Sequence, residues 1–176
     1  MRLALLGVLL ATPLAAQQPA QQPAPVPPPP QPAFAADSAA VVGIVKNLFN
    51  GMRTRDTALM RAQFHSSATM RSVSYDRTAK AVVEEDGPSD WIGGVGSAPA
   101  TLFIDERLGP PTVHVDGNLA TVWVYYELWV GDRFSHCGAD VFTLVRTEGK
   151  WRIASLAWSA EQPPVCEKHP AGPPKP

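Results

Sequence analysis

The second half of the chain alternates between apolar, β-branched stretches and short turn sequences. The turns are Asp116-Gly117, Gly131-Asp132 and Glu148-Gly149, and such pairs between apolar runs favour two-residue hairpins. The pattern predicts four consecutive antiparallel strands, at 111–115, 119–130, 134–146 and 151–159. A sheet of this length must bury apolar side chains under another layer, and this requirement constrains what the rest of the chain can form.

The segment before this meander supplies helices. From Val41 to Met52 apolar residues recur at helical spacing, with Asp37 or Ser38 as the expected cap. Asp56-Thr57 is expected to cap a second, short helix. Further predicted elements are short strands at 69–74 and 79–84, a short helix after Ser89 that Gly93-Gly94 ends, and a strand or helix at 101–108. Helices followed by an antiparallel sheet predict an α+β domain with two layers.

Both ends of the chain have compositions that do not fold into a core. Residues 1–16 have a short basic start, an apolar stretch too short to span a bilayer and small residues at its end, which is typical of a secretory signal peptide. We expect a Pro/Gln/Ala-rich linker at 17–36, a folded domain at 37–166 and a Pro-rich tail at 167–176. The sequence therefore predicts an exported protein, periplasmic or secreted after cleavage, with no stable membrane anchor.

The charge of the chain disfavours one class of partner. Its formal net charge is −1, and acidic and basic residues are mixed along the sequence without runs of either sign. Proteins that bind nucleic acid usually carry a basic patch or stripe. We therefore expect no nucleic-acid partner.

Counting outward from the predicted turns assigns side chains to the two faces of the sheet. The turn at Gly131-Asp132 pairs Glu127 with His136 and Trp123 with Asp140. One predicted face carries Leu119, Trp123, Tyr125, Glu127, His136, Asp140, Phe142, Leu144, Trp151 and Ile153. The opposite face carries Val122, Val124, Tyr126, Leu128, Cys137, Ala139, Val141, Val145, Leu156 and Trp158.

Because both predicted faces are apolar, both need a cover. We expect the helices to cover the face that contains Phe142, Leu144 and Ile153, and a cavity to open beside it. A second copy of the chain would then cover the opposite face, which gives a homodimer. The residues expected at that dimer surface are Val122, Val124, Tyr126 and Val141. A bulge in any strand would exchange the two faces.

The sequence offers no pattern for a metal or a nucleotide cofactor. His136 and Cys137 are adjacent in a predicted strand, so they point to opposite faces and cannot ligate one ion. The segment Gly93-Gly94-Val95-Gly96 lacks the glycine spacing of a dinucleotide-binding loop. We expect neither a metal nor a cofactor.

The chain has two cysteines, Cys137 in a predicted strand and Cys166 beyond the last one. In an exported protein two cysteines most simply form a disulfide. The alternative is two unrelated thiols, one of them buried.

Three segments together resemble the nuclear transport factor 2-like superfamily: 117–125, 134–146 and 149–154. The chain is most similar to an exported branch labelled lumazine-binding or SnoaL-like. The resemblance implies a cone, in which a strongly bent sheet wraps around helices, and it usually implies a dimer through the sheet. Members of this branch share a Ser-His-Cys-Gly segment, here 135–138, and a cysteine after the last strand, here Cys166, which supports the disulfide.

The fold of this superfamily serves several functions, so three hypotheses remain open. The first is a binding protein for a small apolar or aromatic molecule. The second is an isomerase, cyclase or dehydratase with Asp140 as base, assisted by His136 or Tyr125; the alternative for Asp140 is a fixed structural acid. The third is a dimerisation or interaction module with a filled cone. The expected pocket residues are Phe64, Met70, Trp91, Trp123, Tyr125, Glu127, His136, Asp140 and Phe142.

Overall fold

The structure, a computed structural model, describes residues 34–166. Within this range the order of elements is helix, helix, two strands, helix and five strands. The helices are α1 (Phe34–Thr54), α2 (Thr57–Gln63) and α3 (Pro88–Ser97). The strands are β1 (Phe64–Tyr75), β2 (Ala81–Asp86), β3 (Ile104–Leu108), β4 (Thr112–Asp116), β5 (Leu119–Val130), β6 (Arg133–Thr147) and β7 (Lys150–Ser159).

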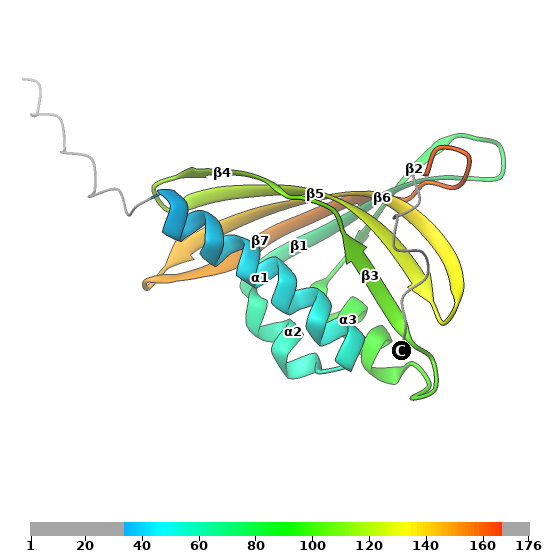
Figure 1. Ribbon diagram of the computed structural model, residues 1–176, viewed down its shortest axis with the longest axis horizontal. Coiled ribbons are helices and arrows are strands. Elements are labelled where there is room, and N and C mark those ends of the chain that lie inside the picture. Colours follow the sequence, from blue (N-terminus) through cyan, green and yellow to red (C-terminus); the bar gives the residue numbers. More distant parts are fainter. Residues whose placement is uncertain (1–33, 167–176) are drawn as a thin grey trace, which may run out of the picture.

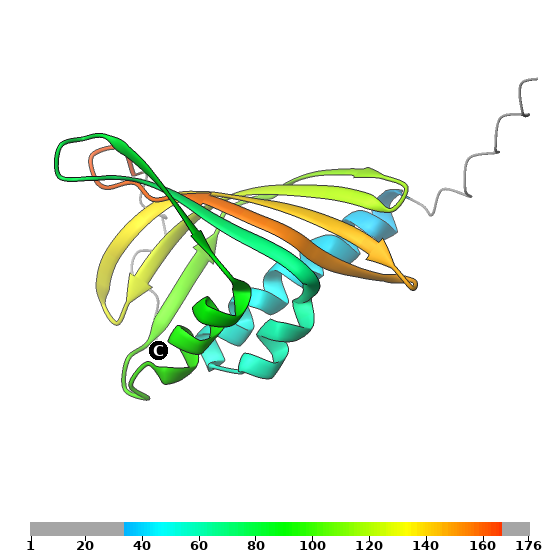
Figure 2. The ribbon, with the colours of Figure 1, turned by 180° about the vertical axis from the view of Figure 1, so that it is seen from behind.

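All the described strands belong to one bent, open sheet (Figure 1). Its order is β2-β1-β7-β6-β5-β3, and β4 pairs with β5 beside β3. The meander is antiparallel, as predicted, whereas β1 runs parallel to β7, which makes the sheet mixed. The three helices lie together under the concave side of the sheet, and the view from behind shows the same arrangement (Figure 2). The predicted α+β cone is therefore confirmed.

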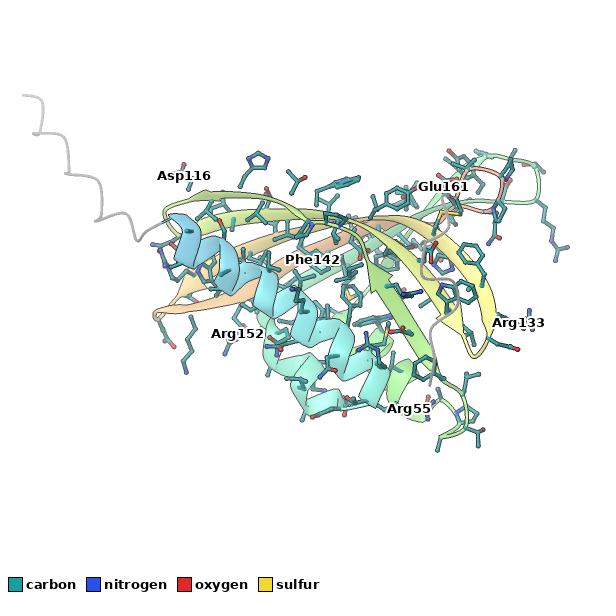
Figure 3. All side chains as sticks on the ribbon, viewed as in Figure 1. Arg55, Asp116, Arg133, Phe142, Arg152 and Glu161 are labelled. Atoms are coloured by element: carbon teal, nitrogen blue, oxygen red, sulfur yellow. A yellow bond between two sulfur atoms is a disulfide. The ribbon has the colours of Figure 1, made fainter. Side chains whose placement is uncertain are left out.

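The core fills the space between α1 and the sheet. The helical stripe that was predicted from the sequence is buried, from Val41 through Val45 and Leu48 to Met52. Phe49 meets Phe142 of β6 edge to face, with ring centroids 6.0 Å apart. Phe142 lies between the sheet and α1 (Figure 3). Burial of this apolar stripe stabilises the contact of α1 with the sheet by roughly 25 cal/mol for each Å² removed from water.

Two helix boundaries differ from the sequence prediction. Helix α1 begins at Phe34, before the expected cap. The carboxylate of Asp37 instead accepts a hydrogen bond from Arg146 of β6, so its side chain is used in tertiary structure and not as a cap. Helix α3 runs through Gly93-Gly94, which were predicted to end it. Pro88 at its first turn and the buried Ile92 support this helix despite the low helical propensity of glycine.

Two of the three predicted hairpin turns are confirmed. Val130 pairs with Arg133 across Gly131-Asp132, and Thr147 pairs with Lys150 across Glu148-Gly149. The turn between β4 and β5 lies one residue later than predicted, at Gly117-Asn118, because Asp116 pairs with Leu119. Gly117 has a positive φ of 57°, a backbone conformation that glycine adopts without strain.

Bulges change the register that the turns predicted. In β6 Ser135 is an extra residue, so Trp129 pairs with Phe134 but Leu128 pairs with His136. A second shift falls at Ala154 of β7. Side chains alternate between the two faces of a sheet. One extra residue in a strand therefore reverses, for every pair beyond it, the face on which the residues of the neighbouring strand were expected to lie.

The bulge at Ser135 corrects the predicted faces. As predicted, Phe142, Leu144 and Ile153 face the helices and are buried. On β5 the assignment was wrong, because Val122, Val124 and Tyr126 share this inner face, whereas Trp123 is 43% exposed on the outer one. The three inner residues therefore cannot form the dimer surface, and of the four proposed positions only Val141 lies outside. The dimer itself stays a prediction.

Among residues 34–166, no helix is long and apolar enough to cross a membrane. The predicted signal peptide and nearly all of the predicted linker and tail lie outside the described residues.

Candidate functional site

A cavity of about 210 Å³ opens inside the cone, between the bent sheet and the helices. In Figure 1 the β5–β6 hairpin curls down on the right, the same side as β3 and α3. The cavity takes residues from α1, α3 and five strands. Its lining residues are Phe49, Met70, Trp91, Glu106, Tyr126, Leu128, His136, Asp140, Leu156 and Trp158.

Two carboxyl groups meet in this apolar cavity. Asp140 on β6 is only 2% exposed, and Glu106 on β3 lines the cavity with it. Burial raises the pKa of Asp140 to about 7, and a hydrogen bond from Glu106 opposes part of that rise. The pKa of Glu106 lies well above its ordinary value, first because of burial and then because of the charge of Asp140. The two groups therefore share a proton near neutral pH, with Glu106 as the donor.

Asp140 has an unusual hydrogen-bonding environment for a buried carboxylate. Its Oδ2 is buried and accepts no hydrogen bond from an N–H or hydroxyl group. Among the described residues, its only hydrogen-bonding partner is the carboxyl group of Glu106. Most buried polar atoms in proteins have such partners, so an exception of this kind needs an explanation.

The other titratable groups of the cavity are His136 and Tyr126. Burial lowers the pKa of His136, which keeps its imidazole neutral at pH 7. Its Nδ1 lies 3.0 Å from the hydroxyl oxygen of Ser135. Tyr126 donates its hydroxyl proton to the carbonyl oxygen of Ser159 at 2.7 Å, so toward the cavity this oxygen can only accept. Burial, followed by the charges of Glu106 and Asp140, raises the pKa of Tyr126 and keeps the phenol protonated.

The wall that carries His136 and Asp140 is held by the end of the chain. At Gly138, between them, a Cβ atom would lie 1.9 Å from the carbonyl oxygen of Ser159, so only glycine allows this approach. Beyond β7, Glu161 exchanges two backbone hydrogen bonds with Cys137. Cys137 and Cys166 form a disulfide, with Cα atoms 5.7 Å apart. The disulfide predicted from the sequence is thus present and fastens the last residues beside the cavity wall.

The structure brings four of the predicted pocket residues together. Met70, Trp91, His136 and Asp140 line the cavity. Phe64 packs edge to face against Trp91, with centroids 6.5 Å apart, and lies behind the wall.

The remaining predicted pocket residues lie elsewhere. Phe142 is fully buried in the core. Trp123, Tyr125 and Glu127 point to the opposite side of the sheet, because the bulge in β6 shifts their partners by one residue. Glu127 pairs in register with Cys137 and accepts a hydrogen bond from Trp129, so its predicted contact with His136 is wrong. Tyr125 therefore cannot assist Asp140 within the cavity.

Sequence reasoning missed six lining residues. Glu106 was missed because 101–108 read as either strand or helix, which left its side-chain direction open. Tyr126 and Leu128 were placed on the opposite face, and so were Leu156 and Trp158 beyond the second bulge. Phe49 was recognised as a core residue of the helical stripe but not as part of a cavity. The strand pairing of Glu106 with Leu128 is what brings the acid to the pocket.

A larger opening of about 530 Å³ lies between α1 and the segment that joins β3 to β4. It is lined mainly by apolar residues such as Val42, Val45 and Leu108, and Lys46 is the charged residue among those that line it. The carboxyl pair makes the smaller cavity the candidate site. Residues 34–166 contain no group of three or more His, Cys, Asp or Glu side chains that could hold a metal ion.

Comparison with protein families gives one match to this chain. The family described as "Putative lumazine-binding" matches residues 36–159, which is most of the described range. No protein of curated function matches the chain in a sequence comparison.

Solved structures with the same fold are numerous but distant in sequence. A nuclear transport factor 2-like protein of unknown function from Shewanella baltica is 16% identical, with a TM-score of 0.56 over 75% of this chain and 99% of that one. One from Silicibacter pomeroyi is 19% identical, with a TM-score of 0.56 over 73% and 99%. A protein from Novosphingobium aromaticivorans described as the "beta subunit of a putative aromatic-ring-hydroxylating dioxygenase" is 11% identical, with a TM-score of 0.60 over 73% and 91%. These matches establish the fold alone.

Proposed function

The chain belongs to the nuclear transport factor 2-like family described as "Putative lumazine-binding", and we propose that it binds a small aromatic molecule in the cavity beside Asp140. The size of the cavity supports this proposal. An apolar cavity of roughly 150 Å³ accommodates benzene, so about 210 Å³ suits a molecule of one or two rings. The cavity also favours a binding protein over a module with a filled cone.

The walls of the cavity suit such a ligand. Phe49, Trp91, Tyr126 and Trp158 surround it from four different elements. Aromatic rings that stack or meet edge to face gain about 0.5–1.5 kcal/mol per pair beyond the area they bury. A mainly apolar pocket with a few converging polar groups is the usual form of a small-molecule site.

The observation that carries the proposal is the environment of Asp140. This carboxylate is buried, yet it has no N–H or hydroxyl donor among the described residues. A carboxylate with a structural role normally accepts several such hydrogen bonds, because burying an unsatisfied charge is costly. A ligand that places a donor beside Asp140 would remove this cost.

Asp140→Asn tests the proposal, with Asp132→Asn in the exposed β5–β6 turn as the matched control. A set of one- and two-ring fragments is screened against the purified protein by ligand-observed NMR. We expect fragments that bind the wild type to bind Asp140→Asn about tenfold more weakly, since one lost hydrogen bond to a charged group costs about 1.5–3 kcal/mol. Binding to Asp132→Asn should be unchanged. Failure of the whole set to bind, or equal binding by all three proteins, would contradict the proposal.

A second candidate function is proton transfer by an isomerase, cyclase or dehydratase, with Asp140 as the base. The observation that favours it is the pKa of Asp140, which burial raises to about 7, where a general base works best at neutral pH. Glu106 would return the proton, and neutral His136 would orient the substrate. A ligand that the wild type converts and Asp140→Asn binds without conversion would establish this function.

We also propose that the protein works outside the cytoplasm, after export. Disulfides persist mainly in oxidising compartments, and the Cys137–Cys166 bond supports this location. The mass of the protein isolated from each cell fraction and alkylated without reductant tests the proposal. We expect a processed chain with no alkyl groups in the periplasmic or extracellular fraction.

A further inference from the structure

The two acids and the hydroxyl oxygen of Tyr126 supply the hydrogen-bond acceptors of the cavity, and the only donors beside them among the described lining residues are the neutral N–H groups of Trp91, Trp158 and His136. Among the described residues that line it, Glu106 and Asp140 are the acids, and neither lysine nor arginine occurs. The hydroxyl proton of Tyr126 is already donated to Ser159, and the acidic proton of Glu106 to Asp140. A ligand therefore meets one negative charge and acceptor oxygens, with no positive charge to oppose them.

The aromatic walls favour the same kind of ligand. Rings attract cations because the face of a π-system is negative, and tryptophan does so most strongly. The cavity has two tryptophans, Trp91 from α3 and Trp158 from β7, together with Tyr126 and Phe49. A cavity of aromatic rings around a buried carboxylate is a favourable environment for an organic cation.

From these contacts we infer that the cavity selects the protonated form of a small aromatic amine, whose ammonium group lies against the Asp140–Glu106 pair. This inference rests on the proposed function and names the ligand class. The ammonium N–H groups would supply the donors that Asp140 lacks. A carboxylate ligand would instead bring a further negative charge beside the pair.

The shared proton couples this binding to pH. When the cation enters, Glu106 no longer needs to donate to Asp140, and its proton leaves to solvent, so that an ammonium and two carboxylates remain. The other titratable groups around the pair are His136 on β6 and Tyr126 on β5. The charge of Asp105 on β3 contributes to the raised pKa of Glu106, and the charge of Glu161, beyond β7, contributes to that of Tyr126. Asp105 itself is paired with Arg53 of α1. Helix α1 contributes Phe49 to the cavity and α3 contributes Trp91, neither of which titrates.

Three probes of nearly equal shape test the inference: benzylamine, benzyl alcohol and benzoate. Each is titrated by calorimetry into the wild type, Asp140→Asn, Glu106→Gln and the control Asp132→Asn, with folding of each variant checked by thermal unfolding. We expect the wild type to bind benzylamine at least about tenfold more tightly than benzyl alcohol, the equivalent of one charge-assisted contact, and benzoate most weakly.

The variants test whether the charge of Asp140 selects the amine, and the buffers test whether Glu106 releases its proton. Asp140→Asn should bind the amine and the alcohol equally, and Asp132→Asn should behave as the wild type. In the wild type near pH 8, where Asp140 is already mostly ionised, the heat of amine binding should depend on the ionisation enthalpy of the buffer, because Glu106 releases a proton, and Glu106→Gln should lose most of this dependence.

The outcomes also separate this inference from the proposed function. If benzyl alcohol or benzoate binds as tightly as benzylamine, the inference is wrong and the proposed function stands. If the fragment screen and all three probes fail to bind the folded wild type, both are wrong.

Discussion

Two buried aspartates, Asp37 on α1 and Asp140 on β6, have contrasting hydrogen-bonding environments. Asp37 lies in the first turns of α1, at the left of Figure 1, and is 6% exposed. Its Oδ1 accepts hydrogen bonds from Arg146 at 2.7 Å and from Trp151 at 3.2 Å, and the Arg146 guanidinium lies 4.8 Å from the Trp151 ring. Asp140, 2% exposed, has only the carboxyl group of Glu106.

The difference shows that burial alone does not distinguish a structural carboxylate from a functional one. Asp37 is neutralised by a cation and fixed by two donors, so it contributes to the attachment of α1. Asp140 faces a second acid inside a cavity, which destabilises the folded chain unless a proton or a ligand compensates. Natural proteins keep such an arrangement mainly where it serves binding or chemistry.

The largest expected effect on stability concerns the disulfide beside the cavity. Among the described residues, Asp140 has no ion-pair partner that would stabilise the wall of the cavity. We therefore expect the stability of this wall to depend on the Cys137–Cys166 bond, which joins residues 29 positions apart. The double variant Cys137→Ser, Cys166→Ser should lower the free energy of unfolding by about 3–4 kcal/mol, by the chain-entropy estimate for such a loop. Chemical denaturation measures this loss, and reduction of the wild type should reproduce it. A loss below about 1 kcal/mol would contradict the comparison.

At the start of α1, Arg146→Met removes the cation that pairs with Asp37 and leaves the Asp37 carboxylate buried. We expect the free energy of unfolding to fall by about 2–3 kcal/mol, somewhat less than for a fully buried pair, because the Arg146 side chain is 17% exposed. The matched control is Arg71→Met, which breaks the exposed pair with Glu85 and should cost less than about 1 kcal/mol. Equal losses in denaturant melts would mean that the Asp37 cluster is not a structural anchor.

The smallest effect is the pH dependence of stability. Asp140 is ionised at pH 6.5 in the unfolded chain, whereas in the folded chain burial raises its pKa to about 7. The folded state therefore holds more protons, and stability falls as pH rises through 7. Asp140 alone contributes about 1 kcal/mol of this loss between pH 6.5 and 8.5, and the raised pKa of Glu106 acts in the same direction. The lowered pKa of His136 acts in the opposite direction, mainly below pH 6.5.

Asp140→Asn should reduce this pH dependence and make the protein more stable than the wild type at pH 8.5. Asp132→Asn, in the exposed turn, should keep the pH dependence of the wild type. Denaturant melts at both pH values check the prediction. A wild type that gains stability from pH 6.5 to 8.5 would show that Asp140 is ionised in the folded state through other contacts.

The fold was predictable because its signals are local. Turn pairs such as Gly131-Asp132 set the hairpins, and the spacing from Val41 to Met52 set α1. The site was less predictable, since it depends on which side each strand residue faces. One extra residue, Ser135, decided this for β5, and no local signal marks a bulge at Ser135.

Of the two acids in the cavity, Asp140 was predictable from local turn signals and Glu106 was not. Asp140 lies on a strand whose direction the turns fixed, so its side of the sheet was predicted, although Trp123 and Tyr125, expected as its aromatic neighbours, lie on the opposite side. Glu106 lies on β3, a strand of five residues that pairs only with the distant β5 among the described strands. Its position is a product of tertiary pairing, which propensity does not contain.

The parallel pairing of β1 with β7 sets the order in which the molecule can fold. Met70 of β1 lies beside Leu156 of β7, so the sheet joins an early segment to the last strand. Any process that delivers the chain from its N-terminus, whether synthesis or passage through a membrane pore, must deliver β7 before this pairing can form. Until then β1 has only its hairpin partner β2, and the slow closure typical of such distant contacts keeps the cone open.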